Sequence, residues 1–197
     1  ARILQADGRG PTIVFCRTKR TCQKTSDDLA ERGFRATSIH GDLGQSAREK
    51  ALNDFKAGKS DVLVATDVAA RGIDIDGITH VINYQCPEDE KTYVHRIGRT
   101  ARAGADGISV TFIDWDDLAR WKMIDTALVL GLGEPEETYS SSDHLYQMLS
   151  IPAGSNGRIT KQKPVAKIEK VVSKERAAKP ASDKTPRNRT RTKKFSS

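Results

Sequence analysis

Three arginines spaced three residues apart are the strongest chemical signal in the sequence. Arg96, Arg99 and Arg102 lie in the segment YVHRIGRTARAG, residues 93–104. In a helix-like turn, this spacing places the side chains along one side. A planar guanidinium with five N–H donors suits phosphate oxygens, so the segment predicts a phosphate site. A solvated basic helix that makes only surface ion pairs is the alternative that spacing alone leaves open.

A second polar segment favours the phosphate site. Residues 65–75 have the sequence ATDVAARGIDI and follow a buried apolar run. Thr66, Asp67, Arg71 and Asp74 thus come within one short stretch at the predicted end of a strand. An ordinary strand-to-helix loop with an Asp cap is the alternative, but so many polar groups at one strand end favour a binding site.

Short β-branched runs predict the strands that position these segments. The runs are residues 12–16, 36–39, 62–65, 80–84 and 108–113. Their length and their Gly, Asp or Pro boundaries are typical of central strands. Because helical patterns alternate with them, we expect an α/β fold with a parallel sheet sandwiched by helices. Functional residues in such sheets collect beyond the carboxyl ends of the strands.

Local signals predict where the intervening helices begin and end. A helix over residues 19–33 is expected to end at Gly33. Ser46 and Glu49 predict a capping box for a helix that ends at Gly58. Asp114 is expected to cap a further helix that closes at Gly131.

Composition and charge divide the chain into three parts. We expect a globular domain over residues 1–133, an acidic, Ser-rich connector over 134–155 and a disordered basic tail over 156–197. The tail holds 14 Lys/Arg and 3 Asp/Glu, whereas residues 1–155 hold 19 and 23. Bulk positive charge thus belongs to the tail, which predicts a sequence-independent nucleic-acid tether there; a solvated extension is the alternative.

Residue usage excludes several other classes of protein. The three cysteines and four histidines show no metal-ligand or disulfide spacing, so no metal site is expected. No apolar run is long enough for a membrane span, and no signal peptide is expected. Free thiols and these absences predict a cytoplasmic protein. Because the sequence starts at Ala1 and not at Met, we expect it to be part of a longer chain.

The two polar segments resemble motifs V and VI of the DEAD-box RNA helicases. Upstream, IVFCRTK at residues 13–19 resembles motif IV, HGD at 40–42 resembles the corresponding turn, and Gln45 with Arg48 resembles the family's QxxR. The resemblance covers roughly residues 10–132, and the motifs also match in order and separation. The connector and tail resemble bacterial RhlE-type members. Ala101 stands where the family usually has Gly.

The resemblance implies a RecA-like helicase C-terminal domain, the second of two. The arginines corresponding to Arg99 and Arg102 act as catalytic arginine fingers on the γ-phosphate of ATP. Gly72 and Asp74 complete the ATP-binding set by facing the ribose and phosphates. His95 and Arg96 are expected at the interdomain seam.

RNA is the second ligand that the resemblance implies. Gly41, Gln45, Arg48 and Thr66 are expected to hold the phosphate-sugar backbone of one RNA strand without sequence preference.

The sequence lacks the phosphate loop that would hold most of the nucleotide. The pattern G-x-x-x-x-G-K-[ST] does not occur. Gly58-Lys59-Ser60 matches its last three positions, but Asn53 stands five residues before Gly58, where the pattern needs a glycine. The resemblance therefore implies ATP with Mg²⁺ held mainly by a missing N-terminal RecA-like domain, which is the expected protein partner. We expect an RNA-stimulated ATPase and helicase in the longer protein and an inactive fragment by itself. A non-enzymatic RNA-binding module and a DNA translocase are the alternatives.

Overall fold

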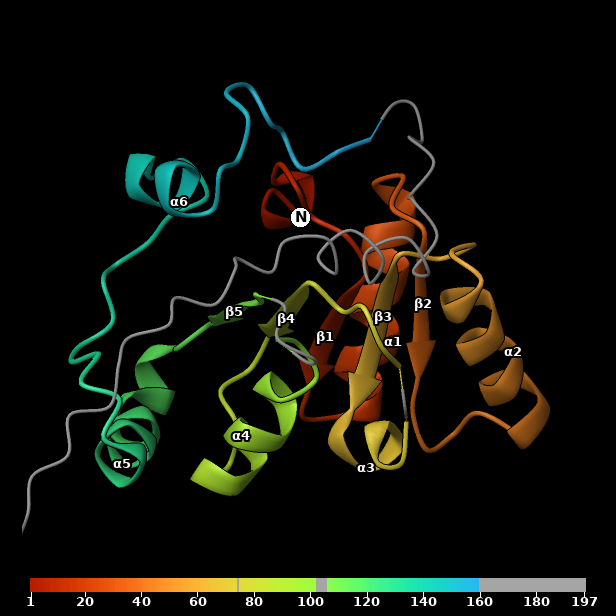
Figure 1. Ribbon diagram of the computed structural model, residues 1–197, viewed down its shortest axis with the longest axis horizontal. Helices are drawn as coiled ribbons and strands as arrows, with labels where there is room; N and C mark the ends of the chain where they lie inside the picture. The colour runs from red at the N-terminus through yellow and green to blue at the C-terminus, as the bar shows by residue number, and fades with distance from the viewer. Residues whose placement is uncertain (74, 102–105, 160–197) are drawn as a thin grey trace, which may run out of the picture.

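A five-stranded parallel sheet forms the centre of the computed structural model, which describes residues 1–73, 75–101 and 106–159 (Figure 1). The strand order is β2-β3-β1-β4-β5, and every neighbouring pair is parallel. The bounds are β1 Thr12–Cys16, β2 Ala36–Ile39, β3 Val62–Thr66, β4 His80–Asn83 and β5 Ile108–Thr111. The predicted α/β fold with a helix-covered parallel sheet is confirmed.

Two runs predicted as central strands, those of β2 and β5, lie at the edges of the sheet. The run 108–113 is predicted as a central strand, yet β5 lies at the edge of the sheet and ends at Thr111. Ile108 and Ser109 are exposed, because β5 has a strand neighbour on one side only among the described residues. β-branched composition therefore identified the strand but not its position in the sheet.

Helices connect the strands and cover both faces. The α-helices are α1 Lys19–Glu31, α2 Gln45–Lys56, α3 Asp67–Ala70, α4 Glu90–Ile97, α5 Leu118–Leu128 and α6 Asp143–Met148; two short 3-10 helices are η1 Ile3–Gln5 and η2 Trp115–Asp117. Gly33 and Gly58 follow α1 and α2 with φ of 88° and 71°, which confirms the predicted glycine ends.

Two predicted helix caps are wrong. Gly44 is the N-cap of α2 and Ser46 lies inside the helix, so the expected capping box does not form. Instead, Gln45 donates a side-chain hydrogen bond to Glu49 one turn later. Asp114 caps η2 by accepting from the Trp115 backbone N–H, and α5 begins only at Leu118.

The predicted end of α5 at Gly131 is also wrong. The helix ends at Leu128, and Val129 takes a left-handed conformation with φ of 52°. Asp125 explains the early stop, because its carbonyl accepts from Leu130 N and its carboxylate accepts from Leu132 N. The chain therefore turns around Asp125 before it reaches the glycine.

Alternate residues of β1 supply two separate cores. Val14 and Cys16 pack in the cluster that contains α1, whereas Ile13 and Phe15 pack in the cluster that contains α2 and α3. A third cluster joins α4 to α5, where Tyr93 meets Trp121 edge to face at 5.7 Å between ring centroids. The sheet is thus held rigidly between its helices, which fixes the ends of its strands.

The segment 134–155, expected to be a connector, contains structure of its own. It includes α6, and after this helix Leu149 and Ile151 are buried in the same cluster as Ile3 and Leu4. The predicted boundaries at 133 and 155 stay predictions, and most of the predicted tail lies outside the described residues. None of the helices that the structure describes is long and apolar enough to cross a membrane.

Candidate functional site

The predicted site residues gather beyond the carboxyl ends of the strands. Thr66 is the last residue of β3, Gly41 follows β2 closely, and Arg96 lies in the last turn of α4. Figure 1 shows α3 and α4 below the strand tips, at the end of the sheet opposite to the N-terminus. The topology therefore brings motifs V and VI to one edge, here called the carboxyl edge.

A buried ion pair joins the two motifs. Arg96 Nε and Nη2 donate to the two carboxylate oxygens of Asp67, both at 2.7 Å. Arg96 Nη1 donates to Asn83 Oδ1 at 3.2 Å and to the Gln85 carbonyl at 3.0 Å. The guanidinium also lies 5.3 Å from the centroid of the Phe15 ring.

These contacts make Arg96 a support inside the domain. Its side chain is 1% exposed, whereas that of Asp67 is 29% exposed. A bidentate pair fixes the guanidinium in orientation as well as in position. Arg96 therefore ties the ends of β3 and β4 to α4, while the neighbouring His95 is exposed. The interdomain role predicted for both residues stays a prediction.

Arg99 makes the second contact between the motifs. Its Nη1 donates to the Ile73 carbonyl at 2.9 Å, and the side chain is partly buried. Gly72, just before, has φ of 72°, a backbone conformation that L side chains rarely adopt. Arg99 thus lies against the loop that leads to Asp74. Two predicted ATP-binding residues, Asp74 and Arg102, lie outside the described residues.

Ala101 occupies a strained backbone position. Its φ is 55°, in the left-handed region where glycine is favoured. Thr100 beside it donates its hydroxyl to the Ile78 carbonyl at 2.7 Å, and a Cβ at Gly107 would collide with Thr100. The close packing holds the backbone in this form. Alanine in place of the family's usual Gly therefore strains the backbone at this position, although the added methyl group is small.

The predicted RNA-binding residues form the other half of the carboxyl edge. Gly41 is exposed, and a Cβ there would meet nothing within 4 Å. Gln45 is exposed at the start of α2, and Thr66 is buried at the start of α3. Arg48 Nη2 donates to the Ala69 carbonyl at 2.8 Å. This bond links α2 to α3. The predicted RNA-binding residues and the predicted phosphate-binding residues therefore meet at this short helix.

A buried histidine orients the turn that contains Gly41. His40 Nε2 lies 3.0 Å from Gln23 Oε1, which also accepts from the Ser38 hydroxyl. His40 Nδ1 accepts from the Asp42 backbone N–H at 3.4 Å. Because Gln23 Oε1 is only an acceptor, His40 Nε2 is the donor in this contact. The turn is therefore held in place by α1, which contains Gln23.

Sequence reasoning missed several residues that support the site. Asn83 and Gln85 hold Arg96, but neither was singled out. A polar amide at the end of a fully buried strand is the signal that could have found Asn83. Asp117 is a further support, since its buried carboxylate pairs with both Arg17 and Arg120. Its position depends on a long-range contact that no local pattern reveals.

The cysteines are not part of the chemistry. All three are free and buried. Burial raises the pKa of the Cys16 thiol to about 11 and that of Cys22 to about 12. Both thiols are therefore protonated at neutral pH and are poor nucleophiles and metal ligands. The part of the chain that the structure describes contains no cluster of three potential metal-ligating residues.

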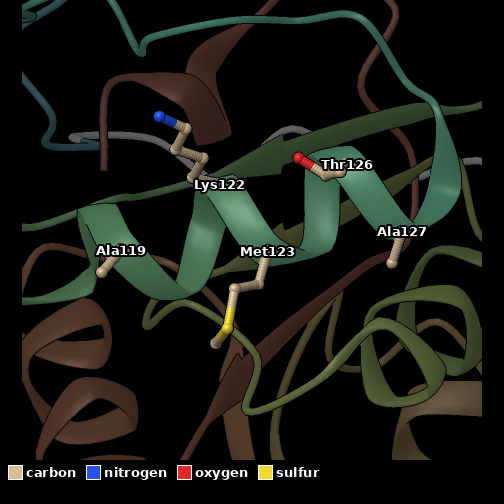
Figure 2. A pocket seen from close by; sticks show the side chains of 5 residues that line it. All are labelled: Ala119, Lys122, Met123, Thr126 and Ala127. Carbon is tan, nitrogen blue, oxygen red and sulfur yellow. The ribbon is translucent and has the colours of Figure 1, made fainter.

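A shallow hollow on α5 offers no alternative site. Ala119, Lys122, Met123, Thr126 and Ala127 line it along one side of the helix (Figure 2). The Met123 side chain is largely exposed. The polar groups of this hollow are the Lys122 ammonium and the Thr126 hydroxyl, which form neither an acid–base pair nor an activated nucleophile. The carboxyl edge therefore remains the candidate site.

The strand order and the position of this site define a RecA-like domain. Residues 1–104 match the family model "Helicase conserved C-terminal domain", so the chain belongs to this family.

Curated relatives agree with this assignment. The chain is 50% identical over 125 residues to "ATP-dependent RNA helicase CshA" of Listeria monocytogenes, covering 64% of this chain and 24% of that protein. It is 54% identical over 112 residues to "DEAD-box ATP-dependent RNA helicase CshA" of Bacillus subtilis, covering 57% and 23%. The chain thus spans about a quarter of these relatives.

Solved structures show the same fold. The Escherichia coli DEAD-box protein SrmB, solved bound to regulator of ribonuclease activity A, is 33% identical with a TM-score of 0.62, covering 71% of this chain and 86% of that one. A DEAD box protein from Methanococcus jannaschii is 41% identical with a TM-score of 0.60, covering 65% and 35%. The predicted DEAD-box helicase resemblance is confirmed; the RhlE-type assignment stays a prediction.

Proposed function

We propose that this chain supplies the second lobe of an ATP-dependent RNA helicase, in which RNA-stimulated ATP hydrolysis is coupled to local duplex unwinding. One observation carries the proposal: Arg96–Asp67 and Arg99–Ile73 join motifs V and VI at the carboxyl edge. The names of the relatives support the substrate class, because CshA is an ATP-dependent RNA helicase.

The phosphate-binding half of the site fits a nucleotide that a first lobe presents. Arg99 is only partly buried, and one of its N–H groups donates to the Ile73 carbonyl. Its other N–H groups can therefore reach a phosphate oxygen. Arg99 and Arg102 stabilise the charge that develops on the γ-phosphate, while Gly72 and Asp74 hold the ribose and phosphates. The first lobe would hold Mg²⁺, which would supply charge neutralisation at the phosphates. Arg96 acts through Asp67 as a positioning residue.

The RNA-binding half fits a phosphate backbone. Gly41 leaves open space, and Gln45 and Arg48 of α2 provide N–H donors, of which Arg48 contacts α3 at the Ala69 carbonyl. Thr66 lies within the same edge. These residues hold one RNA strand through phosphate and sugar without reading its bases. Closure of the two lobes then assembles the arginines around the triphosphate in a site with little water.

ATP hydrolysis tests the proposal. In a chain extended by the N-terminal RecA-like domain, Arg99→Ala and Arg102→Ala each lower the RNA-stimulated rate by a factor on the order of 10³. Lys122→Ala, which removes an exposed cation on α5, is the matched control and leaves the rate unchanged. Unchanged hydrolysis in both arginine variants would show that these residues are not fingers.

A non-enzymatic RNA-binding module is the second candidate, favoured by the lack of a phosphate-loop sequence. Under the main proposal, the chain by itself binds RNA without hydrolysing ATP, and hydrolysis appears only when the first lobe is added. If the extended chain still does not hydrolyse ATP with RNA present, the binding module is the correct function. Competition between single-stranded RNA and DNA in the same assay tests the DNA translocase alternative.

A further inference from the structure

The turn that follows β2 contains a glycine that the fold itself does not require. His40 and Leu43 close this turn, because the Leu43 backbone N–H donates to the His40 carbonyl at 3.1 Å. Gly41 and Asp42 are its two central residues, and both are exposed. The φ of Gly41 lies outside the left-handed region, and a Cβ there would meet nothing within 4 Å. The bare backbone of Gly41 therefore fits the close approach of a ligand from outside the domain.

One exposed carboxylate determines which way an amide of α1 points. Gln23 Nε2 donates to Asp27 Oδ1 at 2.7 Å, one helical turn later. Because an ionised carboxylate only accepts hydrogen bonds, the NH₂ end of the amide faces Asp27. The carbonyl end then faces β2, where Gln23 Oε1 accepts from the Ser38 hydroxyl at 2.9 Å and lies 3.0 Å from His40 Nε2. Asp27 therefore makes Gln23 an acceptor on the side of the sheet.

His40 transmits this orientation to the turn. Since its Nε2 faces the Gln23 acceptor, its Nδ1 accepts from the Asp42 backbone N–H, at 3.4 Å. Gly41 lies between these two residues, so its peptide groups are held at both ends. The His40 side chain is buried, and a buried hydrogen bond is costly to lose. A chain of hydrogen bonds thus runs from the outer surface of α1, through Gln23 and His40, to the backbone around Gly41.

A second contact from α1 to the same turn is weaker. Lys19 Nζ lies 2.7 Å from Asp42 Oδ1, but the two side chains are 61% and 58% exposed. Exposed ion pairs contribute little, because water and salt screen them. Lys19 also reaches the Asp42 side chain and not its backbone. The hydrogen bonds of Gln23 are therefore the contacts that orient the turn.

We propose that Gln23 is a positioning residue for RNA binding, because through His40 it holds the backbone of Gly41 in the orientation that an RNA phosphate requires. This inference rests on the proposed RNA-binding function. Gln23 acts through His40 and needs no contact with RNA of its own. A turn that is already ordered costs less entropy to bind, so loss of this order weakens RNA binding. The arginines that act on ATP stay in place.

The RNA dependence of ATP hydrolysis measures this role in a chain extended by the N-terminal RecA-like domain. Gln23→Leu removes the acceptor and raises the RNA concentration for half-maximal stimulation about fivefold to tenfold. The kcat at saturating RNA stays the same. Gln23→Glu keeps an acceptor oxygen toward His40 and restores most of the RNA affinity, with a small loss from the like charge of Asp27. A purely structural role would lower kcat as well.

Two neighbouring carboxylates provide a matched pair of variants. Asp27 and Asp28 are both exposed on α1, but Asp27 bonds Gln23 whereas Asp28 projects from another side of the helix. Asp27→Ala lets the amide rotate, so the productive orientation is about half populated and the half-maximal RNA concentration rises about twofold. Asp28→Ala leaves it unchanged. This pair tests the inference even if Gln23→Leu folds poorly.

Combination with RNA-contact variants identifies where Gln23 acts. Gly41→Ala preserves the fold but places a methyl group where the phosphate approaches. Because both changes affect one turn, Gln23→Leu weakens RNA binding much less in the Gly41→Ala background than in the wild type. In the Arg48→Ala background it keeps its full effect, since Arg48 is held separately by the Ala69 carbonyl.

Three results overturn the inference. The first is an unchanged RNA requirement in Gln23→Leu, and the second is an equal loss in Gln23→Leu and Gln23→Glu. The third is full multiplication of the Gln23→Leu and Gly41→Ala effects, which would show that the two residues act independently. A wild-type extended chain that hydrolyses no ATP contradicts the proposed function instead. Binding of a labelled single-stranded RNA to this chain then provides the same comparisons without ATP.

Discussion

The two edges of the sheet each contain a buried Arg–Asp pair, yet the pairs are built differently. At the carboxyl edge the arginine is the buried partner: Arg96 is 1% exposed and makes two 2.7 Å bonds to Asp67. At the amino edge, where the strands begin, both partners of the closest pair are buried, since Asp61 is 6% exposed and Arg9, 3.3 Å away, is 8% exposed. Asp61 also lies 3.5 Å from Arg35, which is 19% exposed. The same two residue types therefore form a bidentate pair with short bonds at one edge and longer contacts to two arginines at the other.

The difference shows what each edge requires. Every nitrogen of the Arg96 guanidinium donates at least one hydrogen bond, which fixes the two motifs in one orientation. Among the described residues, Asp61 Oδ1 has no hydrogen-bond partner, although it is buried. The carboxyl edge is therefore held by directional bonds that can orient Arg99. The amino edge is held by charge and by residues 149–159, which pack against the N-terminal segment.

Removal of the carboxylate at the carboxyl edge has the largest expected effect on stability. Asp67→Ala leaves the Arg96 charge buried without its partner and lowers the free energy of unfolding by about 3–5 kcal/mol. Urea unfolding followed by circular dichroism measures this loss. Asp76→Ala, at an exposed position, is the control and costs little. A loss below about 1 kcal/mol for Asp67→Ala would place this pair with ordinary surface ion pairs.

The amino edge responds to pH through His80. Burial, with a smaller contribution from Arg9, lowers the pKa of this histidine from 6.5 to about 4. The unfolded chain thus binds a proton near pH 6.5 that the folded chain does not bind until about pH 4. Stability from this group is complete above pH 6.5 and is lost as pH falls from there toward 4, by about 2 kcal/mol at pH 5.

Urea unfolding at pH 7 and pH 5 checks this pH dependence. His80→Asn removes the titrating group, so the difference in stability between the two pH values shrinks by about 2 kcal/mol. His95→Asn alters an exposed histidine and keeps the wild-type difference. If the His80 variant keeps the full difference, other groups cause the loss at low pH.

The smallest expected effect concerns Ala101 at the carboxyl edge. Ala101→Gly relieves a left-handed φ that costs about 1–2 kcal/mol, but adds freedom to the unfolded chain worth about 0.4–1 kcal/mol. The net gain is about 0.5–1 kcal/mol in the free energy of unfolding. Ala119→Gly, in the exposed face of α5, is the matched control and destabilises by about 1 kcal/mol. Equal destabilisation in both variants would contradict the strained backbone at Ala101.

Local patterns were sufficient to predict most of the fold. The β-branched runs that became β1 and β3 are buried at every position, so composition and burial agree there. Gly33 and Gly58 end their helices because only glycine adopts the required φ cheaply. Val129 broke this rule, since hydrogen bonds to Asp125 outweighed the cost of its left-handed φ. The end of α5 was thus decided by contacts that the helical pattern does not contain.

Prediction of the site was less complete. The spacing of Arg96 and Arg99 indicated phosphate chemistry, but only the fold shows that Arg96 faces inward to Asp67. Leu149 and Ile151 belong to a short apolar stretch, LYQMLSI at residues 145–151, within a segment whose composition predicted only an acidic, Ser-rich connector. Their burial depends on a contact with Ile3 and Leu4, about 145 residues earlier in the chain. Long-range packing of this kind is what the sequence pattern could not supply.

The packing of residues 149–159 against the N-terminal segment also determines how the domain bears mechanical load. Ala1 lies against Gly157, because a Cβ at Gly157 would be 3.1 Å from the Ala1 Cβ. A force that pulls these two points apart acts first on the few hydrogen bonds of Gln5 and Arg2, and reaches the sheet only after they break. Tension applied beyond Ile159 acts first on the Ile159–Arg32 hydrogen bond and then on the bonds of Gln5 and Arg2, so residues 149–159 separate from the domain before the strands do.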